Sequence, residues 1–315
     1  MAVAALRREL SRRMYVRTRV ARAGAVRLAY LAYSRALLRW EDRSSPEAAG
    51  SLRRRLEELF DEDFRELPEN AAPDRYPGYY ARNFHYQTDG YLGHTSAALY
   101  DLQVELLFGG TADAMRRRMV PPVVRGARAR NASAADPLRV LDVACGTGHL
   151  LGMLGAALPD EAKLFGVDLS PHYIARAREV LPRDLDVSLV CDNAEKLPFL
   201  DGSFDAATSA YLLHELPPEV RSRVLTEMAR VVRPGGLVVV ADSIQLADAP
   251  ELEREILAFP ARFHEPYYTS YVKDDLGARV SQAGLRVTSS RLAFLTKLVT
   301  AEKTAPGPAA PTNGR

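Results

Sequence analysis

Short apolar runs alternate with helical patterns between residues 138 and 242. The apolar runs read LRVLDVA, AKLFGVDL, DVSLVCD, FDAATSA and GLVVVADS. Alternation of this kind is typical of β-α-β units, so it predicts an α/β domain built on a parallel sheet. Beyond residue 243 the pattern predicts one or two helices and then two strands, over 286–294 and around 296–302.

Capping residues indicate where several helices begin and end. Ser170 followed by Pro171 predicts a helix start, because a capping hydroxyl precedes a proline at the first helical position. The run Pro234-Gly235-Gly236 predicts the end of a helix just before a strand. Upstream, Thr95 predicts the N-cap of a helix that ends near Phe108.

Residues 1–40 carry a basic amphipathic pattern. They hold ten arginines and one acid, Glu9, and apolar residues recur at helical spacing at Val3, Leu6 and Leu10. We expect a helix that packs on its own domain or on a second subunit, or that makes peripheral contact with an anionic membrane. The rest of the chain is net acidic, which argues against a broad nucleic-acid-binding face.

The pattern divides the chain into four stretches. After the basic segment 1–40, residues 41–137 are expected to form a helical cap or lid with an aromatic cluster at 79–94. Residues 138–302 are expected to form the sheet domain. The tail 303–315 is rich in proline, alanine and glycine and is expected to be disordered.

Composition favours a soluble globular protein. Of the 315 residues, 47% are apolar and 26% are charged. The sequence has no uncharged apolar run of the roughly eighteen residues that a membrane-spanning helix requires. The two cysteines, Cys145 and Cys191, do not predict a disulfide framework, so we expect a reducing, cytoplasmic setting.

The strongest motif is VLDVACGTGHL at residues 140–150, where an apolar strand is followed by a glycine turn and a helix. Gly146 and Gly148 let the backbone approach a ligand closely. A dinucleotide site would have the pattern Gly-x-Gly-x-x-Gly, whose third glycine would fall at Leu151. The dinucleotide pattern is therefore incomplete.

The same segment resembles the first motif of class I S-adenosylmethionine-dependent methyltransferases, an acid followed by x-Gly-x-Gly-x-Gly. Ala144 replaces the first glycine here. The resemblance implies that the backbone of Gly146–Gly148 lies beside the methionine part of the cofactor. It also implies that Asp142 orders the turn or contacts the amino group through water.

Two later strand ends extend the resemblance. Asp168 lies twenty residues after Gly148, where an acid can accept hydrogen bonds from both ribose hydroxyls, while Ser170 fills the helix cap. In related enzymes a side chain after the third strand meets adenine, and Asp192 and Asn193 supply suitable groups. The cofactor-binding residues implied are Asp142, Ala144, Gly146, Gly148, Asp168, Leu169, Asp192, Asn193, Ala194 and Ser209.

The runs LPFLDGSFD at 197–205 and RVVRPGGL at 230–237 resemble the segments that precede strands four and five in the same family. The family resemblance implies a seven-stranded, mainly parallel sheet flanked by helices, with its last strand antiparallel. We expect a helical N-terminal cap to cover the site.

Methyl transfer requires that an acceptor be aligned, that water be excluded and, for some acceptors, that a proton be removed. Strand four is followed by SAYLLHELP at 209–217, in which His214 is a candidate base near Glu215, although adjacent helical residues point in different directions. An aromatic cluster at 264–271 is expected to line one pocket with that at 79–94, unless both serve only helix packing. The catalytic candidates are His214, Tyr91, His85 and Tyr211.

The sequence has no Cys/His metal-ligand spacing, and it lacks the Asn-Pro-Pro-aromatic motif of many amino-methylating nucleic-acid enzymes. We therefore expect a metal-independent methyltransferase that acts on a small molecule. A lipophilic or quinone-like acceptor is one option, and C-, O- and N-methylation all stay open. The alternatives are a non-catalytic S-adenosylmethionine-binding partner protein and an NAD-dependent oxidoreductase. The oligomeric state stays open.

Overall fold

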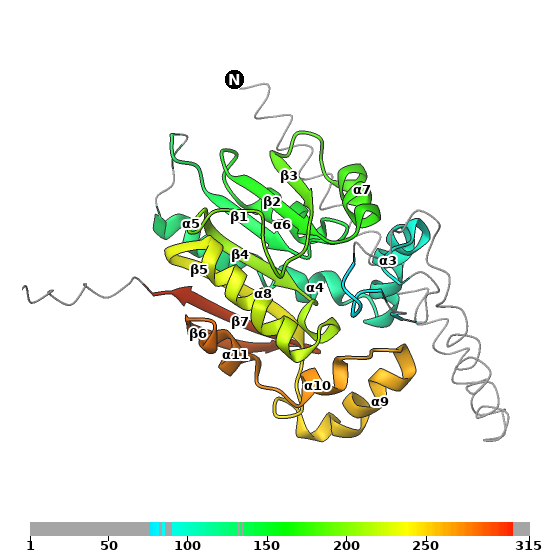
Figure 1. The fold of residues 1–315 in the computed structure, drawn as a ribbon. Helices are drawn as coiled ribbons and strands as arrows, with labels where there is room; N and C mark the ends of the chain where they lie inside the picture. Colours follow the sequence, from blue (N-terminus) through cyan, green and yellow to red (C-terminus); the bar gives the residue numbers. More distant parts are fainter. Residues whose placement is uncertain (1–75, 82–83, 86–89, 131–132, 134, 305–315) are drawn as a thin grey trace, which may run out of the picture.

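The computed structural model describes residues 76–81, 84–85, 90–130, 133 and 135–304 (Figure 1). The expectations for residues 1–40, and for the tail beyond residue 304, lie outside this described part. Within it, no helix is both long enough and apolar enough to cross a membrane.

Seven strands form one sheet in the order β3-β2-β1-β4-β5-β7-β6 (Figure 1). The strands are β1 (Arg139–Val143), β2 (Lys163–Asp168), β3 (Val187–Cys191), β4 (Phe204–Ala210), β5 (Val232–Ser243), β6 (Leu285–Ala293) and β7 (Thr296–Lys303). The first five strands pair in parallel, and β7 is antiparallel to both β5 and β6. The sheet predicted from the sequence is confirmed, including its antiparallel last strand.

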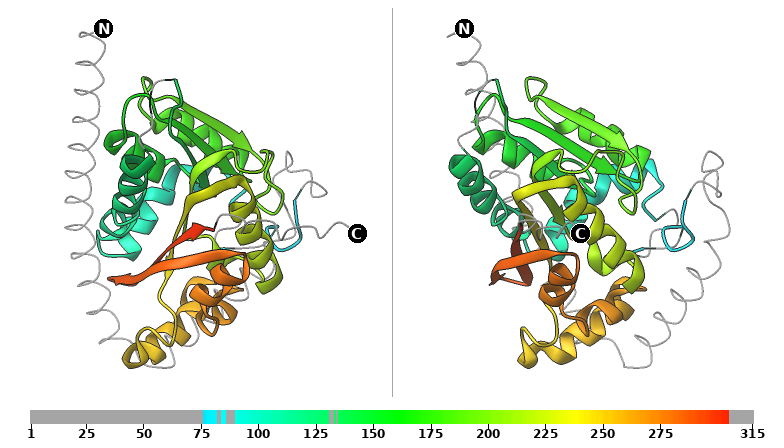
Figure 2. Two further views of the ribbon diagram at one scale, coloured as in Figure 1. Left: turned by 90° about the vertical axis from the view of Figure 1, so that its left-hand side faces the viewer. Right: turned by 60° about the vertical axis from the view of Figure 1, so that its left-hand side comes forward.

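Helices cover both faces of the sheet (Figure 2). One face carries α5 (Val120–Arg130), α6 (His149–Ala157) and α7 (Pro171–Val180), and the other carries α8 (Pro218–Val231), α10 (Tyr268–Val272) and α11 (Leu276–Gln282). The remaining described helices are α3 (His94–Leu107), α4 (Ala112–Arg117), α9 (Glu253–Phe263) and the short 3-10 turns η2 (Leu213–Glu215) and η3 (Pro250–Leu252). Helices α3 and α4 lie beyond the strand ends in Figure 1.

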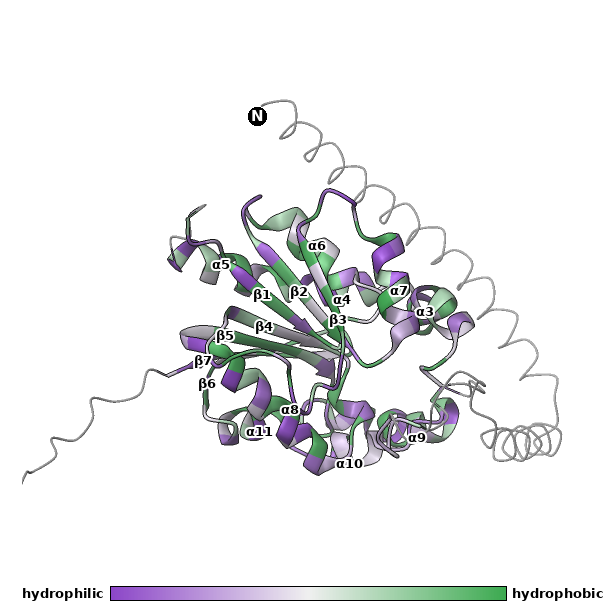
Figure 3. Ribbon diagram, turned by 45° about the horizontal axis from the view of Figure 1, so that its top comes forward, coloured by the Kyte–Doolittle hydropathy of each residue, from purple (hydrophilic) through white to green (hydrophobic). Residues whose placement is uncertain are grey.

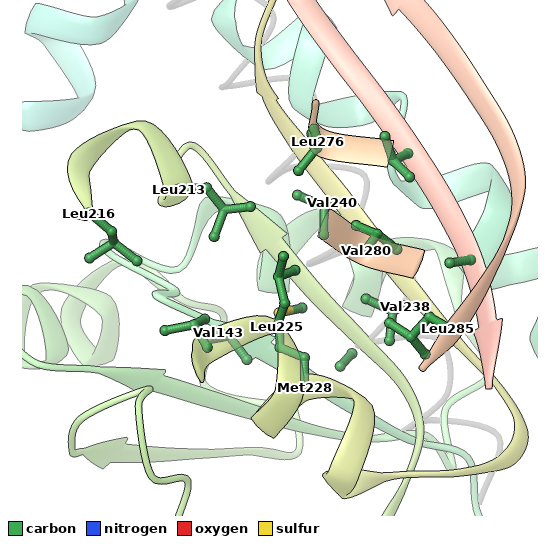
Figure 4. Close-up of a cluster of buried hydrophobic side chains, with 14 of the residues drawn as sticks. Val143, Leu213, Leu216, Leu225, Met228, Val238, Val240, Leu276, Val280 and Leu285 are labelled. Carbon is green, nitrogen blue, oxygen red and sulfur yellow. The ribbon is translucent and has the colours of Figure 1, made fainter. Parts of the chain in front are cut away.

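The hydrophobic core consists of two layers because both sheet faces are covered. In β5, Val238 and Val240 belong to the layer shared with α8 and α11, while Val239 belongs to the layer shared with α6. Figure 4 shows Leu225 and Met228 of α8 packed in the first layer. The central strands are therefore apolar on both sides, and the outer helix faces are polar (Figure 3).

The predicted helix boundaries agree with the structure at Ser170, whose hydroxyl accepts the N–H of Tyr173 at 3.3 Å. Two other boundaries are wrong. Gly93, rather than Thr95, is the N-cap of α3, so this helix has no side-chain cap. Helix α8 already ends at Val231, and residues 234–236 lie inside β5.

Gly166 of β2 gives a test of the packing between the sheet and α6. A Cβ atom there would lie 2.8 Å from Cys145 Sγ, Leu151 Cδ1 and Leu189 Cδ2. We expect Gly166→Ala to lower the free energy of unfolding, measured with urea, by about 1–3 kcal/mol. Gly78→Ala is the control, because no heavy atom lies within 4 Å of its added Cβ. Equal stability of the two variants would contradict this account.

Candidate functional site

A pocket opens where the carboxyl ends of the parallel strands meet α3 and the residues before it. It encloses about 820 Å³ of space between the protein atoms, including space open to solvent. Seven of the expected cofactor residues line it: Ala144, Gly146, Asp168, Leu169, Asp192, Asn193 and Ala194.

The Asp168 carboxylate joins the end of β2 to the glycine turn. Its Oδ2 accepts the N–H of Gly146 at 2.8 Å, and its Oδ1 accepts the N–H of Ser170 at 2.9 Å. Burial raises the pKa of Asp168 to about 6, although these two amides oppose the shift. Each oxygen still has a second lone pair, so the carboxylate can accept two further hydrogen bonds.

The β1–α6 turn depends on left-handed backbone conformations. Ala144, Gly146 and Gly148 have φ angles of +57°, +54° and +79°. Gly148 is the N-cap of α6, and a Cβ atom there would lie 3.0 Å from Leu181 Cδ1. The glycines therefore shape the turn, and Gly148 does so without lining the pocket.

Ala144 adopts this conformation at a cost that glycine would avoid. We expect Ala144→Gly to raise the free energy of unfolding by about 1 kcal/mol in urea denaturation. Ala175→Gly is the matched control, because Ala175 is exposed within α7 and the same change there should lower stability by about 1 kcal/mol. A loss of stability at both positions would show that Ala144 is not strained.

Two other expected cofactor residues lie outside the pocket lining. Asp142 is buried, and its Oδ1 accepts the hydroxyl of Thr208 at 2.7 Å. Burial raises the pKa of Asp142 to about 7, while the Thr208 hydrogen bond opposes the shift. Ser209 is also buried, and its hydroxyl has no hydrogen-bond partner among the described residues. Through its hydrogen bond with Thr208, Asp142 joins β1 to β4.

The residues after β3 are already engaged with one another. The backbone N–H of Asn193 donates to Asp192 Oδ1 at 2.7 Å. The Asn193 side chain accepts the N–H of Glu195 at 2.8 Å and donates to its carboxylate at 3.3 Å. The Asn193 side chain therefore stabilises the turn with both its oxygen and its nitrogen. Among these contacts Asp192 uses only Oδ1, so its carboxylate has more capacity to bind a ligand.

Aromatic side chains form a further part of the pocket lining, the aromatic wall. They are Tyr79, Tyr80, Phe84, Tyr91, Tyr100 and Tyr173. Tyr91 is central, because its ring centroid lies 5.1 Å from that of Phe84 and 5.8 Å from that of Tyr173. Its backbone carbonyl accepts the Ser170 hydroxyl at 2.7 Å. The segment before α3 is thereby joined to the β2–α7 loop.

Glu215 of η2 brings a buried carboxylate to this wall. The Tyr91 hydroxyl donates to its Oε1 at 2.5 Å. His85 Nε2 lies 3.2 Å from the same oxygen and 2.7 Å from Glu265 Oε1. Burial lowers the pKa of His85, but the two glutamates outweigh this effect and raise it to about 10.

His214 lies behind Glu215, outside the pocket lining. Its Nδ1 is 2.6 Å from Asp242 Oδ1, and its Nε2 is 3.6 Å from Glu215 Oε1. Burial lowers the pKa of His214, but Asp242 and the nearby glutamates raise it to about 9. The two neighbours in sequence thus come close, because η2 is a single short 3-10 turn rather than an α-helix.

Of the four catalytic candidates, Tyr91 and Tyr211 line the pocket, whereas His85 and His214 reach it through Glu215. The expectation that both aromatic clusters line one pocket is wrong for Tyr268 and Tyr271. Both pack around the His214 ring, at centroid distances of 5.8 and 6.2 Å, and hydrogen-bond to Ser243.

Comparison with known proteins bears on the middle of the chain. Residues 140–236 match the family model described as a methyltransferase domain. They contain the glycine turn, Asp168 and the turn after β3 that line the pocket. This part of the chain is therefore similar to a methyltransferase domain, as the sequence resemblance implied.

Two curated relatives are similar to this chain over part of its length. The O-methyltransferase rstn1 of Aspergillus nomiae is 34% identical over 154 residues, which are 47% of this chain and 64% of that protein. The demethylmenaquinone methyltransferase of Thermus thermophilus is 37% identical over 147 residues, 46% of this chain and 61% of that protein. The chain therefore spans less than two thirds of either relative.

Among solved structures, a SAM-dependent methyltransferase from Aquifex aeolicus gives a TM-score of 0.43 at 24% sequence identity. The match covers 53% of this chain and 82% of that chain.

The glycine turn, Asp168 and Asp192 form a polar wall of the pocket. This wall fits S-adenosylmethionine, the cofactor of class I methyltransferases. The glycine turn leaves its backbone open to a ligand, since a Cβ added to Gly146 would meet only Tyr173, at 3.9 Å. Asp168 offers carboxylate lone pairs for a diol, Asp192 offers an acceptor for an amino group, and Leu169 adds apolar surface. The pocket would therefore hold the cofactor at the ends of β1, β2 and β3.

Proposed function

We propose that this protein transfers a methyl group from S-adenosylmethionine to a small, planar, lipophilic acceptor such as a phenol or a quinone-like ring. The observation that carries the proposal is that one pocket is lined both by polar groups suited to the cofactor and by aromatic rings suited to such an acceptor. The sulfonium of the cofactor supplies the methyl group.

The sheet order supports a division of the pocket into two ends. Strands β2 and β3 lie on one side of β1 and carry Asp168 and Asp192 at their ends, whereas β4 lies on the other side and leads to Tyr211. The acceptor would lie at the β4 end, against Tyr91 and Glu215.

Tyr91 and Tyr211 would touch and orient the acceptor. The Tyr211 hydroxyl is 2.7 Å from Thr296 Oγ1, and its ring stacks on Phe108 at 5.9 Å, so the side chain is fixed. His85 and His214 would act as positioning residues that hold Glu215 in place. The rings before α3 would exclude water from the acceptor.

The acceptor class is supported by the aromatic lining and by the names of the two relatives, which specify O-methylation and demethylmenaquinone. Stacking on tyrosine and phenylalanine rings favours a flat apolar ring over a charged polymer. Both C- and O-methylation are compatible with such an acceptor.

The proposal is tested by incubating the full chain with S-adenosylmethionine carrying a labelled methyl group and a panel of phenols, hydroquinones, amines and nucleic acids. We expect label in a phenolic or hydroquinone product, identified by mass spectrometry. Tyr91→Ala should abolish turnover while cofactor binding persists. Tight binding of S-adenosylhomocysteine without labelling of any acceptor would instead favour a non-catalytic cofactor-binding protein, and NAD binding would favour an oxidoreductase.

A further inference from the structure

Three buried or half-buried ligand-type side chains meet beside the aromatic wall. His85 comes from the segment before α3, Glu215 from η2, and Glu265 from the loop between α9 and α10. One nitrogen or oxygen atom of each lies within 4.8 Å of the others. Three segments that are distant in sequence thus bring one imidazole and two carboxylates together.

The interatomic distances, which are those of hydrogen bonds, are also compatible with a shared coordination sphere. His85 Nε2 is 3.2 Å from Glu215 Oε1 and 2.7 Å from Glu265 Oε1. Ligand atoms about 2.0–2.2 Å from one metal ion are separated by about 3 Å when they subtend right or tetrahedral angles. The three side chains therefore need little movement to contact a common ion.

The second oxygen of each glutamate is an independent indication that the cluster can take a further ligand. Glu215 and Glu265 are 7% and 3% exposed. The Oε2 atoms of both are buried and have no hydrogen-bond partner among the described residues. Unpaired carboxylate oxygens are costly in a protein interior, so a ligand that contacts them would stabilise the cluster.

The cluster brings two buried carboxylates close together. A divalent ion would neutralise both carboxylates with His85 in its neutral form.

We propose that His85, Glu215 and Glu265 form a binding site for a divalent transition-metal ion. One imidazole and two carboxylates suit Mn²⁺, Fe²⁺ or Zn²⁺, whereas Mg²⁺ prefers oxygen ligands alone. Three protein ligands leave coordination positions open, as in catalytic metal sites. This proposal departs from the expectation, made from the sequence, that the protein has no metal site.

The site adjoins the acceptor end of the pocket. Glu215 lines the pocket, and Tyr91, which also lines it, donates its hydroxyl to the same carboxylate. If the proposed function holds, a polar oxygen of the acceptor would be within reach of the open coordination positions. Metal binding itself does not depend on that function.

The test is titration of the full chain, after EDTA treatment and dialysis, with Zn²⁺ and separately with Mn²⁺, followed by calorimetry. We expect one equivalent of ion to bind. His85→Ala and Glu265→Gln should each weaken binding by at least about 100-fold, since even residues that only support metal ligands often change affinity about 10–100-fold. Thermal melts establish that each variant is folded.

Matched controls are His172→Ala in α7 and Glu219→Gln in α8, which lie outside the cluster and should bind the ion as the unaltered protein does. Absence of binding at millimolar ion, or unchanged binding by folded Glu265→Gln, would overturn the metal site and leave protonated His85 as the cation between the glutamates. Binding of an ion without methyl transfer would overturn the proposed function alone.

Discussion

Replacing Asp168 by alanine is expected to weaken binding of S-adenosylhomocysteine by at least about 100-fold. The carboxylate would lose two roles at once. It would no longer accept hydrogen bonds from a ribose diol, and it would no longer hold the amides of Gly146 and Ser170. Hydrogen bonds to a charged group contribute about 1.5–3 kcal/mol each, so the loss of two exceeds a factor of 100.

Isothermal calorimetry of the full chain measures this effect. The Asp168→Asn variant should bind S-adenosylhomocysteine with an affinity between those of Asp168→Ala and the unaltered protein, because asparagine retains one acceptor oxygen. Asp201→Ala is the control, since it removes the same charge from an exposed surface position whose partner is Arg230. Thermal melts exclude unfolding as the cause. A folded Asp168→Ala variant that binds within threefold of the unaltered protein would overturn the ribose assignment.

The polar wall could be predicted from the sequence because its causes are local. A glycine turn after an apolar strand determines where the backbone is open, and parallel strands end at one edge of a sheet. Asp168 and Asp192 each follow an apolar run, so their convergence follows from the sheet alone. The sequence could therefore predict the cofactor, although it could not predict the acceptor.

The wrong helix end at residues 234–236 has a packing cause. A Cβ atom at Gly236 would lie 2.7 Å from the backbone oxygen of Asp205, so glycine is needed where β5 approaches β4 closely. Arg233 also pairs with the Asp205 carboxylate at 2.6 Å. The Pro-Gly-Gly run reflects contact between neighbouring strands, and local propensity alone cannot distinguish this from a helix stop.

The cluster of His85, Glu215 and Glu265 could not be predicted because its contacts join distant segments. His85, Glu215 and Glu265 carry no spacing signal, and Glu265 approaches His85 only because the loop after α9 folds against the segment before α3. The backbone N–H of His85 donates to the carbonyl of His264 at 3.4 Å, which joins the same two segments.

Asp242 gives the largest expected effect on stability. It is fully buried at the end of β5 and accepts three hydrogen bonds: from the N–H of Leu213 at 2.7 Å, from His214 Nδ1 at 2.6 Å and from the N–H of Ser243 at 2.7 Å. We expect Asp242→Ala to lower the free energy of unfolding by about 3–5 kcal/mol, because it leaves buried donors, including the His214 ring, without an acceptor.

Urea denaturation measures this loss, with Asp275→Ala as the control. Asp275 caps α11 from an exposed position by accepting the N–H of Ala278 at 3.0 Å, so its loss should cost only about 1 kcal/mol. If the two variants lose similar stability, Asp242 does not organise the buried network.

The milder change Asp242→Asn should reduce methyl transfer more than it weakens cofactor binding, because η2 carries Glu215 to the pocket.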